Sequence, residues 1–206
     1  MTVPDQKDAW NELYHSQPRP WRGVTSDTNF PFSNGGTVLD IGCGNGKTSL
    51  ALIDAGHNVI GIDISDAAVR ICEKIAGNRM SVMTASATDI PLNDATMDGV
   101  VMIHVLEHLD ADETERAVKE AERILTPGGK VLVRVFHRDD MRSDNGTRIG
   151  DGTVVRGNGI RYHYFTEEEL GCLFASFSET YLKRIDSVTK FGERRSQIEA
   201  VYEKNG

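Results

Sequence analysis

Nine consecutive residues decide the fold of this 206-residue chain: Val38-Leu39-Asp40-Ile41-Gly42-Cys43-Gly44-Asn45-Gly46. The first four predict a buried strand, and residues 47–55 predict a helix. Three alternate glycines lie between them, so bare backbone N–H groups at a helix N-terminus can approach a ligand. A second acid, Asp63, ends the next apolar strand, twenty-one residues after Gly42. That spacing suits a carboxylate that binds a ribose diol, and the sequence therefore predicts a nucleoside site.

Two other glycine-rich loops are excluded by single positions. A Walker A loop requires a glycine where Ile41 stands, and the dinucleotide fingerprint G-x-G-x-x-G requires one where Lys47 stands. A tight strand-to-helix turn without a ligand is the structural alternative.

The pattern Asp-x-Gly-x-Gly-x-Gly from Asp40 to Gly46 resembles motif I of the class I S-adenosylmethionine-dependent methyltransferases, in their small, single-domain, methyltransferase-11-like form. The resemblance implies that the glycine turn approaches the methionine part of S-adenosylmethionine and that Asp63 binds its ribose. It also implies a role for the acid in Asp89-Ile90-Pro91-Leu92, which would accept a hydrogen bond from the adenine amino group. The expected cofactor-binding residues of this region are Asp40, Gly42, Cys43, Gly44, Asn45, Gly46, Asp63, Ile64, Thr88, Asp89 and Ile90.

Strand and helix patterns alternate along the chain and predict an α/β fold. Strands are expected at 37–41, 58–63, 80–85, 97–103 and 130–136, and helices at 47–55, 66–75 and 112–125. A helix at 166–175 and strands at 180–188 and 197–203 follow an irregular segment, 137–164. The expected fold is a Rossmann-like, doubly wound, seven-stranded sheet with a terminal antiparallel hairpin and helices on both faces. We expect residues 1–36 to form a helical lid segment and residues 37–206 to form the methyltransferase domain, with the insertion 137–164 over the active site.

Composition restricts the class of protein. Three scattered cysteines have no metal-ligand spacing, and the longest near-continuous apolar run, 99–106, is too short to span a membrane. The N-terminus carries no secretion signal, so we expect a cytoplasmic protein without membrane contact. A net charge of −8 argues against a large nonspecific nucleic-acid surface. The segment 134–163 differs, because it holds six arginines and four aspartates.

The run His104-Val105-Leu106-Glu107-His108 fits the H-x-x-E-H signature of zinc peptidases. It leaves a buried strand and follows a nucleotide-type loop, whereas zinc ligation requires two histidines one turn apart on a helix. We therefore expect no metal, and we expect His104 to line the cofactor pocket. A general-base role for His104 stays open, and Glu107 and His108 are expected to support the loop.

Candidates for the acceptor side come from the insertion and its borders. His137 leaves the fifth strand, and His163 lies in an aromatic run before a helix opened by Thr166. Together with His104 they are the candidate catalytic residues, and structural packing is the alternative for each. The glycine-rich insertion predicts a mobile gate, whose arginines would bind a carboxylate or phosphate. The expected substrate-binding residues are Tyr162, Arg148 and Arg156.

Aromatic residues in the N-terminal segment are the remaining candidates for cofactor contacts. Trp10 and Tyr14 lie on a short helix, and Trp21 follows a turn containing Pro18 and Pro20. An aromatic face can meet the sulfonium through cation–π attraction. A helix anchored to the sheet by its aromatic side chains is the structural alternative.

The expected reaction is SN2 transfer of a methyl group from S-adenosylmethionine to a small-molecule acceptor, which the arginines suggest is anionic. The alternative is modification of tRNA. The tract from Arg161 to Leu170 is similar to one in tRNA wobble-uridine methyltransferases, which work with a small activating partner protein, although the order of Tyr and His differs. A cofactor-binding regulator without turnover, or a dehydrogenase, would be distinguished by ligand binding and product analysis.

Overall fold

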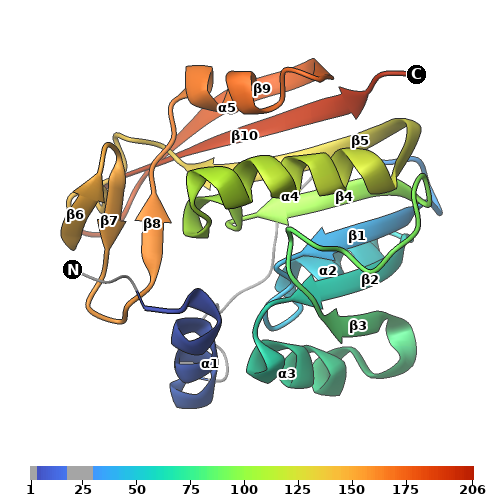
Figure 1. Ribbon diagram of the computed structural model, residues 1–206, viewed down its shortest axis with the longest axis horizontal. Helices are drawn as coiled ribbons and strands as arrows, with labels where there is room; N and C mark the ends of the chain where they lie inside the picture. Colours follow the sequence, from blue (N-terminus) through green and yellow to red (C-terminus); the bar gives the residue numbers. More distant parts are fainter. Residues whose placement is uncertain (1–3, 18–29) are drawn as a thin grey trace.

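The computed structural model describes residues 4–17 and 30–206, so Pro18, Pro20 and Trp21 lie outside the described residues. A seven-stranded sheet forms the centre (Figure 1). Its strands are β1 (Thr37–Ile41), β2 (Asn58–Asp63), β3 (Ser81–Thr84), β4 (Met97–Ile103), β5 (Leu125–Phe136), β9 (Phe177–Val188) and β10 (Arg194–Lys204). The helices are α1 (Gln6–Ser16), α2 (Lys47–Asp54), α3 (Asp66–Ala76), α4 (Ala111–Ile124) and α5 (Glu167–Leu173), with short 3-10 turns at Gly77–Arg79 and Leu106–His108.

The strand order is β3-β2-β1-β4-β5-β10-β9. The first five strands pair in parallel, and β10 pairs antiparallel with both β5 and β9. The order reverses between β1 and β4, and open parallel sheets bind ligands beyond the carboxyl ends of the strands at such a switch point. The expected doubly wound sheet with a terminal antiparallel hairpin is confirmed.

Helices cover both faces of the sheet. On one face, α4 and α5 pack on a core that includes Ile62, Val100 and Val133. On the other face, Leu52 of α2 packs with alternate residues of the same strands and with Phe32. Helix α4 begins at a capping box between Asp110 and Glu113, which satisfies the free N–H groups of its first turn. The two-sided burial explains why the central strands β1 and β4 are mostly apolar.

The insertion is more regular than the sequence suggested. Three short strands, β6 (Thr147–Gly150), β7 (Thr153–Val155) and β8 (Arg161–His163), form an antiparallel sheet of their own. The expectation of an irregular segment over 137–164 was therefore wrong. Val154, Ile160, Tyr162 and Tyr164 form a small core with Phe136 of β5, which holds this second sheet against the domain.

Helix α1 lies between the small sheet and α3 (Figure 1). Gln6 bonds to Gly159 and Arg161 at the insertion end, and Lys7 pairs with Asp66 of α3 at 3.3 Å. The N-terminal helix thus connects the small sheet to α3. Among the described residues, no helix is long and apolar enough to cross a membrane.

Candidate active site

The glycine turn between β1 and α2 adopts a backbone that only glycine tolerates easily. Gly42, Gly44 and Gly46 have φ angles of 68°, 54° and 81°. Each is also crowded, because an added Cβ would lie 2.6 Å from Val105, 2.5 Å from the Tyr14 hydroxyl or 2.9 Å from the Cys72 sulfur, respectively. A methyl group at any of the three positions would therefore collide with one of these side chains.

Asp63 joins the turn to the end of β2. Its Oδ2 accepts from the Gly44 N–H at 2.9 Å, and its Oδ1 accepts from the Ser65 N–H at 2.9 Å. Burial raises the pKa of Asp63 to about 6. Asp40 is also buried and accepts from the Ser49 hydroxyl at 2.5 Å. Burial, followed by the charge of Asp63, raises the pKa of Asp40 to about 7. A nearby positive charge or hydrogen-bond donor would stabilise the ionised form of either carboxyl group.

The third acid, Asp89, lies beyond the end of β3 and is exposed. No described residue donates a hydrogen bond to its carboxylate, which is therefore available to a ligand. Thr88 bonds to Ser86 at 2.8 Å, and the Ile90 N–H donates to Glu120 at 2.7 Å, so both neighbours hold the loop. Two other expected cofactor contacts, Cys43 and Asn45, lie within the glycine turn. Ile64 directly follows Asp63 and is half-buried.

His104 sits directly after β4 with a φ angle of 59°, a left-handed conformation that is costly for a residue other than glycine. Its Nδ1 lies 2.7 Å from Oε1 of Glu107, whose side chain is completely buried. A carboxylate at Nδ1 places the imidazole proton there and leaves the lone pair on Nε2. The His104 ring stacks on Phe136 at 4.3 Å. The prediction that Glu107 supports the loop missed this direct bond, although the i, i+3 spacing signals it.

The zinc motif does not assemble. Nδ1 of His108 donates to the Arg161 carbonyl at 2.7 Å, whereas His104 bonds to Glu107. Burial lowers the pKa of His108, which favours its neutral form. Within residues 4–17 and 30–206, no group of three His, Cys, Asp or Glu side chains could hold a metal ion.

Helix α1 brings its aromatic residues to the rim of the cleft. Tyr14 is buried against α3, with its hydroxyl beside Gly44. Trp10 makes an edge contact with His108 at 4.8 Å. Asn11 fixes the helix, because its Oδ1 accepts from the Ser65 hydroxyl and from the Ala67 N–H. Tyr14 thus lies at the glycine turn, whereas the ring contacts of Trp10 are with His108 and Tyr14.

His137 lies beside α5 and not beside the glycine turn. It receives a hydrogen bond from the Asp139 N–H at Nδ1, and its Nε2 lies 3.2 Å from Glu167 of α5. Phe136 is the last residue of β5, and His137 follows it and forms an isolated bridge to Phe165. The structure therefore places His137 with α5, apart from His104.

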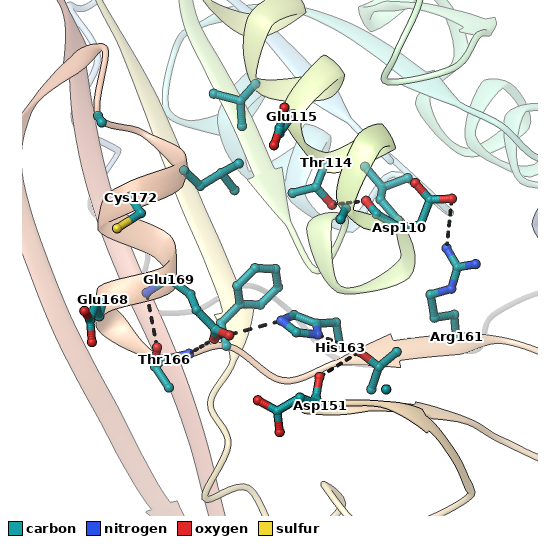
Figure 2. Close-up of a pocket in the computed structure, with 18 of the residues that line it drawn as sticks. Asp110, Thr114, Glu115, Asp151, Arg161, His163, Thr166, Glu168, Glu169 and Cys172 are labelled. Carbon is teal, nitrogen blue, oxygen red and sulfur yellow. Dashed lines mark hydrogen bonds and ion pairs between the residues drawn. The ribbon is translucent and has the colours of Figure 1, made fainter.

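His163 lines a separate groove of about 1180 Å³ between α4, α5 and the small sheet (Figure 2). Its Nδ1 bonds to the Thr153 hydroxyl at 2.8 Å, and its Nε2 lies 3.9 Å from Glu169. Burial lowers its pKa, which favours the neutral ring. Figure 2 also shows Arg161 pointing toward Asp110 at the other end of the groove. None of the cofactor candidates lines this groove.

Of the expected substrate-binding residues, two lie together and one does not. The Arg156 guanidinium lies 3.6 Å from the centre of the Tyr162 ring. Arg148 is mostly exposed and pairs with Asp144 at 2.6 Å. Residue types alone did not identify Arg142 and Arg195, which lie over the Phe136 ring.

Comparison with known proteins agrees with this geometry. A model of the methyltransferase domain family matches residues 39–133. Human tRNA N(3)-cytidine methyltransferase METTL2B is 29% identical over 175 residues, which are 78% of this chain and 45% of the relative. Zebrafish tRNA N(3)-cytidine methyltransferase METTL2 is 31% identical, over 78% of this chain and 48% of its own length. The chain thus spans about half the length of these curated relatives.

Solved structures share the whole fold. A SAM-dependent methyltransferase from Methanosarcina mazei is 26% identical with a TM-score of 0.76, and the match covers 85% of this chain and 98% of that one. A methyltransferase solved in complex with the Haloferax volcanii Trm112 activator has a TM-score of 0.74 at 20% identity, over 100% of this chain and 98% of that one. With the glycine turn, the strand-end acids and the reversed strand order, these matches show that the chain belongs to the class I S-adenosylmethionine-dependent methyltransferases.

Proposed function

We propose that this chain transfers a methyl group from S-adenosylmethionine to a nucleotide of tRNA, with the help of a small activating partner protein. The observation that carries the proposal is the similarity to tRNA methyltransferases over 78% of the chain. The full-length fold match to a methyltransferase in complex with an activator supports the partner. The small-molecule acceptor that we expected from the short, acidic chain has less support.

The residues of the cleft fit S-adenosylmethionine. A Cβ at Gly42 or Gly44 would collide with Val105 or Tyr14, so these positions let the side chains at the turn approach its backbone closely. Asp63 keeps one lone pair on each carboxylate oxygen beyond its two backbone bonds, which suits the two ribose hydroxyls. Asp89 is exposed beyond β3, and its carboxylate can accept from the adenine amino group. When bound, the cofactor supplies a methyl group already activated by a sulfonium.

The protein would orient the methyl acceptor and, where the acceptor carries a proton, remove that proton. His104 presents Nε2 beside Phe136, while Glu107 holds Nδ1. The Nε2 lone pair can accept a hydrogen bond from an N–H or O–H of the acceptor, which orients the acceptor. A ring nitrogen that carries its own lone pair has no proton to lose before it is methylated. For such an acceptor His104 is a positioning residue, and for a hydroxyl or an amine it also takes the proton.

Labelled methyl transfer tests this function directly. The chain, purified with and without an activating partner, is incubated with labelled S-adenosylmethionine and a pool of total tRNA and metabolites. We expect label in tRNA, with more turnover when the partner is present, and nucleoside mass spectrometry would identify the modified base. Label that enters only metabolites would reject tRNA as the acceptor and support a small molecule instead.

A further inference from the structure

A buried carboxylate organises two arginines at the end of β5. Asp140 is 1% exposed and accepts from Nε of Arg142 and from Nε of Arg195, both at 2.9 Å. It also accepts from the backbone N–H groups of Arg142 and Ser196. Both guanidinium groups are therefore held through Nε, which leaves their other nitrogens for other acceptors.

A third arginine joins this cluster through Tyr164. Nη2 of Arg156 donates to the Tyr164 hydroxyl at 2.6 Å, and that hydroxyl donates to the Arg142 carbonyl at 2.8 Å. The Arg156 guanidinium also lies over the Tyr162 ring. Arg142 and Arg156 therefore lie on opposite sides of one tyrosine hydroxyl.

Fewer carboxylates pair with these three arginines than with the other arginines of the insertion. Around Arg142, Arg156 and Arg195, the described residues form ion pairs only through Asp140, which leaves three positive charges against one negative charge, or +2. Other arginines of the insertion have their own acids. Arg138 pairs with Asp151 and Glu169, Arg148 with Asp144, and Arg161 with Asp110 and Glu113.

Two buried nitrogens of the cluster have no acceptor. Nη2 of Arg142 and Nε of Arg156 make no hydrogen bond with any described residue. A charged donor without a partner is costly in the interior, and an oxyanion would satisfy it. Arg138 and Arg161 each carry one such nitrogen as well, but carboxylates lie within 4 Å of both guanidinium groups.

The cluster lies one aromatic ring away from His104. The Phe136 ring is 4.3 Å from the His104 ring, 4.4 Å from the Arg142 guanidinium and 5.7 Å from that of Arg195. The Tyr162 ring, over which the Arg156 guanidinium lies, stacks with the Phe136 ring at a distance of 6.5 Å between ring centres. An anion bound by these arginines would therefore lie close to His104, where we expect the methyl acceptor to bind.

We propose that Arg142 and Arg156 bind a phosphate of the methyl acceptor beside His104, with Arg195 and Asp140 holding Arg142 in place. This proposal rests on the proposed function, in which the acceptor is a nucleotide of RNA. Planar guanidinium groups bind phosphate oxygens through paired N–H donors, and aromatic rings beside them suit an unstacked base. Phosphate contacts position an RNA, while the neighbouring His104 meets the reacting nucleotide.

The first test uses inorganic phosphate and needs no RNA. Proton–nitrogen spectra of the arginine side chains are recorded during a phosphate titration of the wild type, R142Q, R142K, R156Q and the control R116Q, which changes an exposed arginine on α4. We expect the Arg156 Nε–H signal of the wild type to shift with phosphate. The affinity should fall about tenfold in R142Q and R156Q, less in R142K, and not in R116Q. Equal phosphate affinity in all five proteins would overturn the proposal.

The second test separates this proposal from the proposed function. With tRNA as acceptor, R142Q and R156Q should raise KM about tenfold and change kcat less than about threefold, while R116Q behaves as wild type. If the wild type methylates tRNA and the KM of R142Q and R156Q is unchanged, the phosphate site is overturned but the proposed function is not. A wild type that binds phosphate through Arg142 but never methylates RNA overturns the proposed function and the assignment of this phosphate to an RNA acceptor.

Discussion

The backbone N–H of Gly44 donates to Oδ2 of Asp63 at 2.9 Å. This one bond joins the glycine turn after β1 to the acid that ends β2, so two strands present one continuous surface. The remaining lone pairs of Asp63 are therefore held beside the glycine turn. Two further candidate cofactor residues lie near these strand ends. The Tyr14 hydroxyl lies beside Gly44, and Asp89 is exposed beyond the end of β3.

G44A should weaken cofactor binding. The new methyl group would lie 2.5 Å from the Tyr14 hydroxyl and would force a backbone with φ of 54° onto alanine. We expect the Kd for S-adenosylhomocysteine, measured by calorimetry, to rise by about tenfold or more. G56A is the matched control, because Gly56 also has a positive φ but meets nothing within 4 Å. A G44A protein that binds as tightly as G56A would contradict the role of the turn.

Binding of S-adenosylmethionine should tighten as the pH rises. The raised pKa values of Asp63 and Asp40, about 6 and about 7, leave both carboxyls partly protonated near neutrality. Ribose hydroxyls and a sulfonium favour the ionised forms, so binding releases protons. We expect the Kd to fall about tenfold between about pH 5.5 and about pH 7.5, and D63N to lose much of this dependence.

In the protein without ligand, Asp40 and Asp63 should make the free energy of unfolding fall as the pH rises. Between about pH 4 and about pH 7 the folded state binds more protons than the unfolded state, because burial raises the pKa of each carboxyl. The free energy of unfolding should therefore fall as the pH rises through this window, and D63N should weaken the fall. Urea unfolding at several pH values measures both. A pH-independent Kd together with a flat stability profile would show that the acids are ionised throughout.

E107Q should lower turnover without weakening cofactor binding. Glu107 holds Nδ1 of His104, and a neutral amide holds that proton less firmly. We expect kcat to fall about tenfold with tRNA, while the Kd for S-adenosylhomocysteine changes less than about twofold. For a ring-nitrogen acceptor the pH profile of kcat should keep its shape in the variant. Unchanged kcat would show that the His104–Glu107 pair serves only the fold.

D140A should destabilise the protein strongly. It removes a carboxylate bonded to Arg142 and Arg195 and leaves their charges uncompensated, which costs about 3 kcal/mol for a buried ion pair. Burial alone would raise the pKa of Asp140, but the bonds from Arg142 and Arg195 outweigh burial and hold that pKa below its usual range. Its contribution to stability is therefore complete near neutral pH and is lost as the pH falls below about 4.

The control for this prediction lies four residues away. Asp144 pairs with Arg148, but its side chain is 83% exposed. D144A should therefore change the free energy of unfolding by less than about 0.5 kcal/mol in the same urea titration. Equal effects of D140A and D144A would contradict the organising role of Asp140.

N11A should loosen the N-terminal helix, which we propose acts as a lid. Asn11 connects α1 to the start of α3 through the Ser65 hydroxyl and the Ala67 N–H. We expect faster dissociation of S-adenosylhomocysteine in stopped-flow measurements, with a smaller change in the association rate. S16A, a change at the exposed end of the same helix, is the control. Identical dissociation rates would show that α1 is a fixed part of the domain.

Periodicity and spacing predicted the sheet well, because the buried parallel strands are continuous apolar runs and the glycine turn has a strict pattern. Residues 37–41 and 97–103 were expected as strands and are β1 and β4. The strands of the insertion were missed because each has only three or four residues and β6 is exposed along its whole length. Such short strands are stabilised by contacts with distant residues, among them Phe136, and not by their own pattern.

The acceptor side was harder to predict because it depends on long-range pairing. Arg195 comes from β10 and meets Asp140, fifty-five residues earlier, in a contact that no local spacing encodes. Arg148 and Arg156 look equivalent in the sequence, but Arg148 bonds to Asp144 and Arg156 turns inward over Tyr162. Phe136 and His137 are adjacent in the sequence, but Phe136 ends β5 and stacks on His104, whereas His137 lies 3.2 Å from Glu167 of α5.

A crystal structure with S-adenosylhomocysteine tests the central claim most directly. We expect the thioether part of the compound against the glycine turn at Gly44, its ribose hydroxyls on Asp63 and its adenine beside Asp89. The same compound found in the groove that His163 lines, or an empty glycine turn at saturating ligand, would contradict it.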